Sequence, residues 1–313
     1  MLAFLTNLGG SIKFGFLLDD KEFECDGFSI RKLDDFEQSV SWFYDNVHVS
    51  DGWVYGSSRS LKKTQEEIKI FKSTAPIVDA KPFKLAATHY LVADTFSEDH
   101  KRFLILGYSF LQGLLLLPEG YQYLKRTPYR SGKLTGLILC RGDGVNGMNV
   151  INHFYLRSDE VMRKQMYTVL HWFLMGQSYE HEWEVFNSQY SVLDGLYKLH
   201  RLREGPLHPK KVSSMAPHGS RPKILAEKCG ITLPEWADGG KAAALCVERN
   251  ALAHEAIYAG NPIGYAVSAE SYSLELVSLN TKLIAASLGI KCPYLKVNPE
   301  NSNQHGWDIE SLH

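Results

Sequence analysis

Arg249, Asn250 and His254 lie within six consecutive residues of the sequence, Arg249-Asn250-Ala251-Leu252-Ala253-His254. A guanidinium group keeps its charge at physiological pH and can neutralise the negative charge of a phosphorane. An imidazole titrates near neutral pH, so it can take up and return protons. An arginine and a histidine held close together can therefore cleave RNA without a metal ion.

The segment around these residues predicts a helix at 241–259, because nine of its nineteen residues are alanine or leucine. The spacing alone carries little weight, since Arg203 and His208 also lie five residues apart. Between that second pair lies Gly205-Pro206, which no helix interior accommodates. Only the pair at 249 and 254 is expected on a helix.

A helix turns by about 100° per residue, which predicts the faces of this segment. We expect Leu245, Leu252 and Ala256 to face the core, while Asn250 and His254 share the opposite edge. Arg249 starts nearer the core face. Its long apolar stem must lie along the surface for the guanidinium to reach the histidine.

The composition is that of a folded, water-soluble protein. The 313 residues, of which 44% are hydrophobic and 22% charged, suffice for two ordinary domains. A formal charge of -1 argues against a protein that coats nucleic acid by bulk electrostatics, so any RNA contact would have to be local. The five cysteines are scattered, which disfavours a disulfide framework or a zinc knuckle. The apolar N-terminus lacks the basic region of a signal peptide, so we expect a cytoplasmic protein without membrane association.

Residues 1–157 predict a mixed, strand-rich domain. Short apolar or alternating segments between turn residues indicate strands near residues 13–18, 23–30, 53–56, 83–92, 133–140 and 148–155. A helix is expected at 99–117, after an N-cap at Ser97. Its apolar part, 104–117, has the length of a buried helix rather than of a membrane span.

Residues 158–295 predict a helical bundle, followed by a polar tail at 296–313. Apolar residues recur every three or four positions in segments that we expect to be helical: 159–175 with Ser158 as its N-cap, 182–202, 222–229, 241–259 and 268–288. The predicted fold class is therefore α+β, with a strand-rich N-terminal domain before an all-α bundle.

An Arg-Asn-x-x-x-His motif on the penultimate helix of a C-terminal bundle resembles the HEPN superfamily of ribonucleases. The pairing with an unrelated N-terminal domain, and Glu255 directly after the histidine, resemble most the ApeA-type abortive-infection group, which acts in bacterial defence against phage. The bundle that carries this resemblance covers about half of the chain.

The resemblance implies a metal-independent endoribonuclease, without a cofactor, that works as a homodimer with one composite site between two motif helices. Arg249 would stabilise the phosphorane, and His254 would act as general acid or base on the RNA 2'-hydroxyl and the leaving group. Asn250 would orient the phosphate or the histidine. Products would carry a 2',3'-cyclic phosphate and a 5'-hydroxyl. Glu255 and Tyr258 are candidates for a supporting role.

A nuclease that harms its own host needs a second, inactive state. We therefore expect the N-terminal domain to respond to a phage-derived or nucleotide trigger, or to restrain the nuclease.

A second interpretation is a non-catalytic HEPN dimer that serves as a scaffold for RNA or a nucleotide. Arg249 would then pair with Glu248 or Glu255, and His254 would be a surface or interface residue. HEPN toxins paired with nucleotidyltransferase antitoxins carry a tyrosine two residues after the histidine. Here Ala256 occupies that position, which disfavours that subgroup.

A basic cluster interleaved with tyrosines is a further candidate for RNA contact. Its members are Lys125, Arg126, Arg130, Lys133 and Arg141. Basic side chains pair with phosphates and aromatic rings stack on bases, so such a mixture can hold a single strand. The alternative is the solvated rim of a loop.

Two motifs of other functions are disfavoured. His254-Glu255 would need a second histidine at Tyr258 to form a zinc protease motif, and no other histidine spacing predicts a metal site. Residues 142–147 match the dinucleotide-binding pattern Gly-x-Gly-x-x-Gly, but 148–154 predicts a strand where the pattern requires a helix. We expect these glycines to form a hairpin loop.

Overall fold

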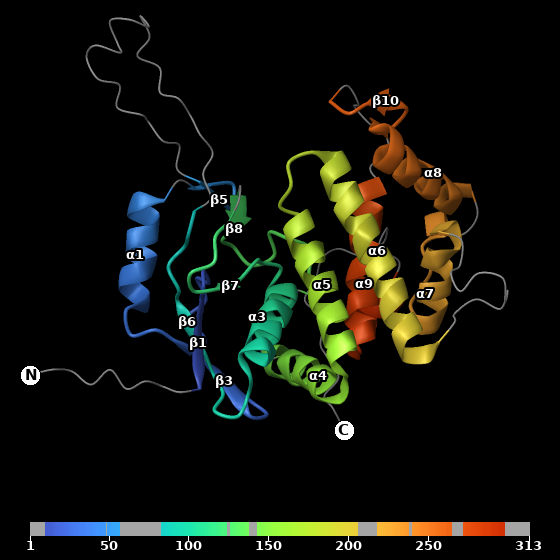
Figure 1. Cartoon of the computed structure of the whole chain (residues 1–313). Coiled ribbons are helices and arrows are strands. Elements are labelled where there is room, and N and C mark those ends of the chain that lie inside the picture. The colour runs from blue at the N-terminus through green and yellow to red at the C-terminus, as the bar shows by residue number, and fades with distance from the viewer. Residues whose placement is uncertain are drawn as a thin grey trace, which may run out of the picture.

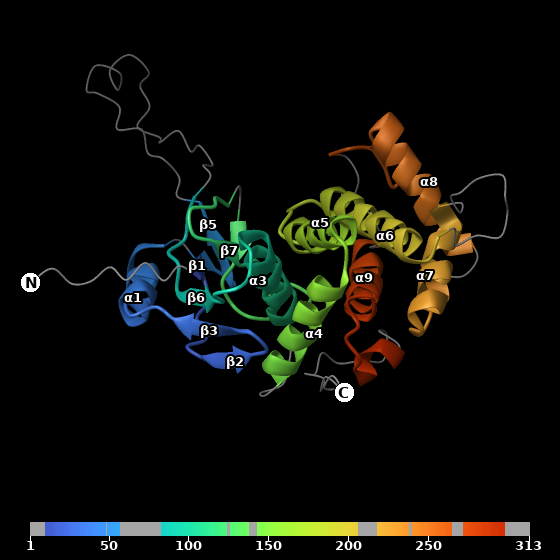
Figure 2. The same ribbon diagram turned by 60° about the horizontal axis from the view of Figure 1, so that its bottom comes forward.

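The computed structural model describes residues 10–47, 49–56, 83–123, 126–137, 143–205, 218–237, 240–264 and 272–297. Figures 1 and 2 show most strands at one side of the molecule and most helices at the other. Two helices, α3 (Glu98–Gln112) and α4 (Asp143–Arg157), lie between them. The fold is mixed α and β, with strands early in the chain and helices late, as the sequence predicts.

An antiparallel five-stranded sheet has the order β2-β3-β6-β1-β7. Its strands are β1 (Ser11–Gly15), β2 (Phe23–Cys25), β3 (Phe28–Lys32), β6 (His89–Val92) and β7 (Leu117–Pro118). The single strand predicted at 23–30 is a hairpin. Asp26-Gly27 forms its two-residue turn, in which Gly27 has a φ of 84°.

A smaller three-stranded sheet packs beside α1 (Phe36–Asn46). Its strands are β4 (Val49–Ser50), β5 (Trp53–Tyr55) and β8 (Arg126–Pro128), in the order β4-β5-β8. The rings of Phe16 and Phe43 stack with centroids 4.2 Å apart in a small core between the helix and this sheet.

α3 begins where the sequence predicts and ends earlier. The Ser97 hydroxyl oxygen accepts a hydrogen bond from the His100 amide at 3.3 Å, which confirms the N-cap. Gly113 ends the helix with a φ of 61°, and a Cβ there would lie 2.4 Å from the Leu134 carbonyl oxygen. The predicted helix to 117 is therefore wrong in its last turn. Among the described residues, no helix combines the length and the hydropathy of a membrane span.

α4 corrects two predictions, the strand at 148–155 and the hairpin loop at 142–147. Met148, Val150, Ile151 and Tyr155 are all buried, because α4 is enclosed between α3, β2 and α9 (Tyr272–Leu288). A helix buried on several sides has no single apolar stripe, so its sequence resembles a strand. The reason given for rejecting a dinucleotide site, a missing helix, is thus wrong. Residues 133–137 nevertheless form no strand, and 138–142 lie outside the described residues.

The C-terminal helices lie close to their predicted positions. They are α5 (Glu160–Gly176), α6 (Glu182–Glu204), α7 (Arg221–Cys229), α8 (Gly240–Glu255) and α9, with short 3-10 helices η1 (His218–Ser220), η2 (Glu235–Ala237) and η3 (Pro293–Lys296). The N-cap of α5 is Asp159 rather than Ser158, since the Asp159 carboxylate accepts from the Met162 amide at 2.8 Å. Of the predicted tail, 298–313 lies outside the described residues.

One apolar core joins the sheet to the helices. Phe14 of β1, Phe110 of α3 and Phe173 of α5 belong to the same buried cluster, and the rings of Phe110 and Phe173 meet edge to face at 5.7 Å. In Figure 2, α8 lies at the edge of the molecule farthest from the sheet. The predicted domain boundary at residue 157 stays a prediction.

Candidate functional site

α8 carries Arg249, Asn250 and His254, as the sequence predicts, and lies beside α6 and η1. The helix ends at Glu255, because Ala256 adopts a left-handed φ of 56°. Ala256 is consequently exposed rather than turned to the core, which corrects the prediction for this residue.

The segment after α8 folds back as a hairpin of β9 (Ile257–Tyr258) and β10 (Asn261–Pro262). The Glu248 carboxylate accepts a hydrogen bond from the Ala259 amide and ties this hairpin to the helix. Tyr258 is buried, and its hydroxyl donates to Glu182 Oε1 at 3.1 Å. Tyr258 therefore anchors the end of α8 to the start of α6 and does not continue the helix.

The candidate residues of α8 differ in burial. Leu245 and Leu252 are buried, as predicted, whereas Asn250 and His254 are exposed and Arg249 is half-buried. Five residues turn a helix by about 500°, so Arg249 and His254 leave α8 about 140° apart. The two side chains of the same chain thus point to different surroundings.

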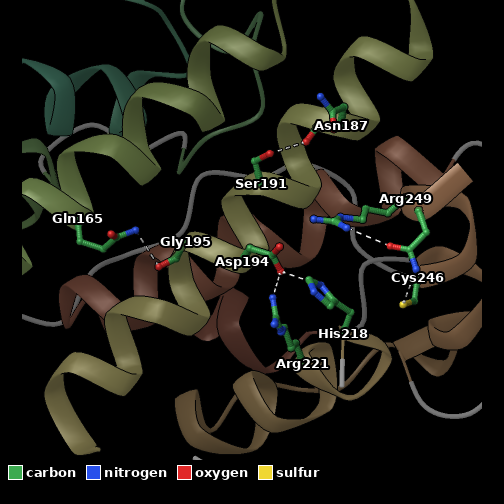
Figure 3. Close-up of polar contacts among 10 residues, drawn as sticks. Gln165, Asn187, Ser191, Asp194, Gly195, His218, Arg221, Cys246 and Arg249 are labelled. Carbon is green, nitrogen blue, oxygen red and sulfur yellow. Dashed lines mark hydrogen bonds and ion pairs between the residues drawn. The ribbon is translucent and has the colours of Figure 1, made fainter. Parts of the chain in front are cut away.

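Arg249 extends from α8 towards α6 (Figure 3). Its Nη1 donates to Asn250 Oδ1 at 3.0 Å, so the amide connects the guanidinium to the exposed edge of the helix. Within the described part of the chain, Arg249 forms no ion pair with a carboxylate, neither with Glu248 nor with Glu255. A half-buried cation without an anion is unfavourable, and a bound anion would stabilise it.

Asp194, His218 and Arg221, which belong to none of the sequence motifs, lie near Arg249 (Figure 3). Asp194 of α6 lies with its Oδ1 3.5 Å from His218 Nδ1, and the same oxygen accepts from Arg221 Nη1 (Figure 3). Arg221 is 2% exposed and its guanidinium lies 4.9 Å from the centroid of the Tyr197 ring. Asp194 is thus held by a buried cation and in turn holds the imidazole.

The surroundings of His218 favour the neutral imidazole. Partial burial lowers its pKa, and the charges of Arg221 and Arg249 lower it further, while Asp194 opposes them. Its place beside α8 follows from Gly219, where a Cβ would lie 3.3 Å from the Ala242 carbonyl oxygen. His218 is therefore a histidine of the same chain within electrostatic range of Arg249.

No short motif connects Asp194, His218 and Arg221. They come from three elements, and no metal-ligand spacing in the sequence includes His218. Nothing local in the sequence marks Arg221 as buried, because it precedes a proline at the start of a helix and charged residues are ordinarily exposed.

The predicted basic cluster has several structural contacts. Lys133 Nζ lies 2.9 Å from Asp51 Oδ2, and the Arg130 guanidinium lies 5.4 Å from the Tyr129 ring. The Arg126 guanidinium lies 4.3 Å from the Trp53 ring, which fixes it beside β5. Lys125 and Arg141 lie outside the described residues. The three described members do not adjoin α8.

A second arrangement resembles a nucleophilic triad but has the wrong electrostatics. His200 Nε2 lies 3.4 Å from Cys229 Sγ, and its Nδ1 lies 3.5 Å from Glu204 Oε1. Burial raises the pKa of the Cys229 thiol to about 11, so it is protonated at neutral pH. This cysteine is a packing residue. Among the described residues, no group of three His, Cys, Asp or Glu side chains has the arrangement of a metal site.

Comparison with protein-family models, with curated proteins and with solved structures gives no match. The assignment of function therefore rests on the geometry and chemistry of α8 and its neighbours.

Proposed function

We propose that this chain is a metal-independent endoribonuclease of the HEPN type, acting in bacterial defence against phage by abortive infection. The observation that carries the proposal is Arg249, a half-buried guanidinium with an amide neighbour and no carboxylate partner among the described residues. A phosphate group of RNA is the anion that fits a planar guanidinium best, through paired hydrogen bonds.

The reaction needs a base, an acid and a cation. A base takes the proton of the 2'-hydroxyl, the 2'-oxygen forms a bond to the adjacent phosphorus, and the bond from phosphorus to the 5'-oxygen breaks. An acid returns a proton to the departing 5'-oxygen, which leaves a 2',3'-cyclic phosphate and a 5'-hydroxyl. Arg249 stabilises the dianionic phosphorane, and His254 moves a proton. Asn250, bonded to Arg249, orients the guanidinium.

The exposed face of α8 supports a homodimer. Ala243, Val247, Asn250 and His254 are exposed and follow one another at intervals of four, three and four residues. This spacing places them in one stripe, and the side chain of Val247 is 68% exposed although it is apolar. A second α8 seated on this stripe would bring His254 of the partner subunit to Asn250, whose Oδ1 accepts from Arg249.

Purified protein incubated with mixed RNA in excess EDTA tests the proposal. We expect the wild-type chain to cleave RNA, His254→Ala and Arg249→Ala to lose this activity, and the 3' ends of the products to carry a cyclic phosphate. Arg203→Ala is a matched control, because Arg203 is an exposed arginine five residues before a histidine but outside the site.

Cleavage that stops in EDTA, or that His254→Ala and Arg249→Ala leave unchanged, overturns the proposal. A chain that binds RNA as a dimer without cleaving it under any of these conditions is instead the non-catalytic scaffold.

A further inference from the structure

A groove runs along α5, at the junction of the helical bundle with the strand-rich half of the chain. It consists of two cavities of about 600 Å³ and about 300 Å³. Both cavities are lined by Tyr121 and Tyr167, so they adjoin one another. α3 and the segment after β7 form the opposite wall, beside α5 in both views (Figures 1 and 2).

One face of α5 forms the floor of this groove. Arg163, Tyr167, His171 and Met175 follow one another at intervals of four residues and all line the groove. A rise of 1.5 Å per residue gives about 18 Å from Arg163 to Met175, which is longer than a single nucleotide needs.

An arginine lies at each end of the groove. Four cationic and two carboxylate side chains line it: Arg102, Arg126, Arg163 and Lys164, with Asp99 and Glu160. Arg102 and Lys164 have carboxylate partners, in Glu98 and Glu160. Arg126 and Arg163, at opposite ends of the groove, have none among the described residues.

Both of these arginines are held in place by backbone carbonyls. Arg163 Nε donates to the Tyr155 carbonyl at 2.7 Å, and Arg126 Nη2 donates to the Tyr179 carbonyl at 2.7 Å. Each guanidinium keeps at least one terminal nitrogen without a hydrogen-bond partner in the described part of the chain. Two preoriented cations are therefore available to anions at the two ends of the groove.

Aromatic rings lie between the two charged ends. Tyr121 is 45% exposed, and the rings of Tyr167 and His171 are nearly parallel, with centroids 6.4 Å apart. Partial burial lowers the pKa of His171, which therefore presents a neutral ring at neutral pH. Phosphate-binding cations flanking stacked rings are the arrangement that binds single-stranded nucleic acid, because every base offers a flat face.

From this arrangement we infer that the groove along α5 binds a single-stranded segment of RNA, with phosphates at Arg163 and Arg126 and bases against Tyr121 and Tyr167. One end of the groove lies at Ser178 and Tyr179, just before α6 begins at Glu182. Glu182 accepts a hydrogen bond from Tyr258, which follows the end of α8 by three residues. The groove thus leads towards the end of the motif helix. The inference deepens the proposed function, since it gives the substrate a binding surface outside the reacting residues.

Binding is measured by fluorescence anisotropy with a labelled, unstructured 12-nucleotide RNA. The protein carries His254→Ala, so that the RNA is not cleaved during the titration, and the buffer contains EDTA. We expect Tyr121→Ala to raise the dissociation constant about tenfold or more. We expect Arg163→Gln to weaken binding and to lower the slope of log K against log salt concentration by about 0.7, the value for one lost phosphate contact on a single strand.

Tyr44→Ala and Lys198→Gln are the matched controls, since both residues are exposed and lie outside the groove. Thermal melting establishes that each variant is folded. An unchanged dissociation constant and salt slope in both groove variants overturns the inference. So does displacement of the RNA by AMP, or by a 12-base-pair duplex, at the concentration at which unlabelled single strand displaces it.

The two proposals can fail separately. A wild-type chain that binds RNA in the groove but does not cleave it contradicts the nuclease alone. A chain that cleaves RNA with unchanged binding in the groove variants contradicts the groove alone.

Discussion

α3 and α8 have nearly the same length, 15 and 16 residues, and opposite surroundings. α3 is enclosed, and its polar groups serve the fold: His100 Nε2 lies 2.8 Å from Asn152 Oδ1, and the Ser109 hydroxyl donates to the Ile105 carbonyl at 2.9 Å. α8 lies at the edge of the bundle and exposes Asn250 and His254.

The difference separates polar residues that stabilise the protein from those available for chemistry. A buried polar group without a partner costs free energy, and the side chains of His100, Asn152 and Ser109 around α3 all have partners. On α8 the polar residues contribute little packing, and they remain available to a ligand. Substitutions should accordingly affect activity at α8 and stability around α3 and the Asp194 pair.

The largest effect is expected at Arg249. Arg249→Ala should lower the rate of RNA cleavage about 10²- to 10³-fold, the usual loss when one donor to a transition-state oxyanion is removed. The free energy of unfolding should change by less than about 0.5 kcal/mol. Single-turnover cleavage and urea denaturation measure the two quantities. A large loss of stability in this variant would show that Arg249 serves the fold, as the polar residues of α3 do.

Loss of the ion pair between Asp194 and Arg221 should lower stability, in contrast to substitution of Arg249. Asp194→Ala leaves the buried Arg221 guanidinium without its carboxylate and should lower the free energy of unfolding by about 3 kcal/mol. This is the lower end of the range for buried pairs, since the Asp194 side chain is 27% exposed. Urea denaturation measures the loss. Glu160→Ala, which removes an exposed pair with Lys164, is the control and should cause no measurable change.

The buried histidines near α3 should make stability depend on pH. Burial lowers the pKa of His100 to about 4 and that of His89 to about 4, from 6.5. The unfolded chain therefore binds protons first as the pH falls, and stability present above pH 6.5 is lost towards pH 4.

Each of the two pKa shifts corresponds to a loss of about 3 kcal/mol in the free energy of unfolding between pH 6.5 and pH 4. His100→Gln keeps a hydrogen-bonding group for Asn152 and removes one of the two losses. Denaturation midpoints between pH 7.5 and 4 should fall less steeply in this variant than in the wild type. Equal slopes would show that His100 is not buried in the neutral form.

The smallest effect on stability is expected at two glycines, one on an enclosed helix surface and one on an open one. A Cβ at Gly107 in α3 would lie 2.7 Å from Ile151 Cγ2, whereas a Cβ at Gly144 in α4 meets nothing within 4 Å. Gly107→Ala should destabilise the protein by about 1 to 2 kcal/mol through overpacking. Gly144→Ala should be neutral, or stabilising by up to about 1 kcal/mol, because alanine favours a helix. A thermal melt of both variants decides whether the junction of α3 and α4 is tightly packed.

Features that depend on nearby residues were predictable from the sequence. The alanine content of α8, the Ser97 cap of α3 and the recurrence of apolar residues in α6 all act within a few residues, and these helices lie close to where they were predicted. α4 was assigned to a strand because helix and strand patterns become alike when a short segment is buried on several sides.

The amino-acid order alone determined that Arg249, Asn250 and His254 share one helix, because helix formation depends on local propensity and spacing. Only the tertiary structure decided what each of them meets. It turned Arg249 towards α6, ended the helix before Tyr258, and brought Asp194, His218 and Arg221 beside it from separate elements. Such contacts depend on how distant helices pack, and no local pattern records them.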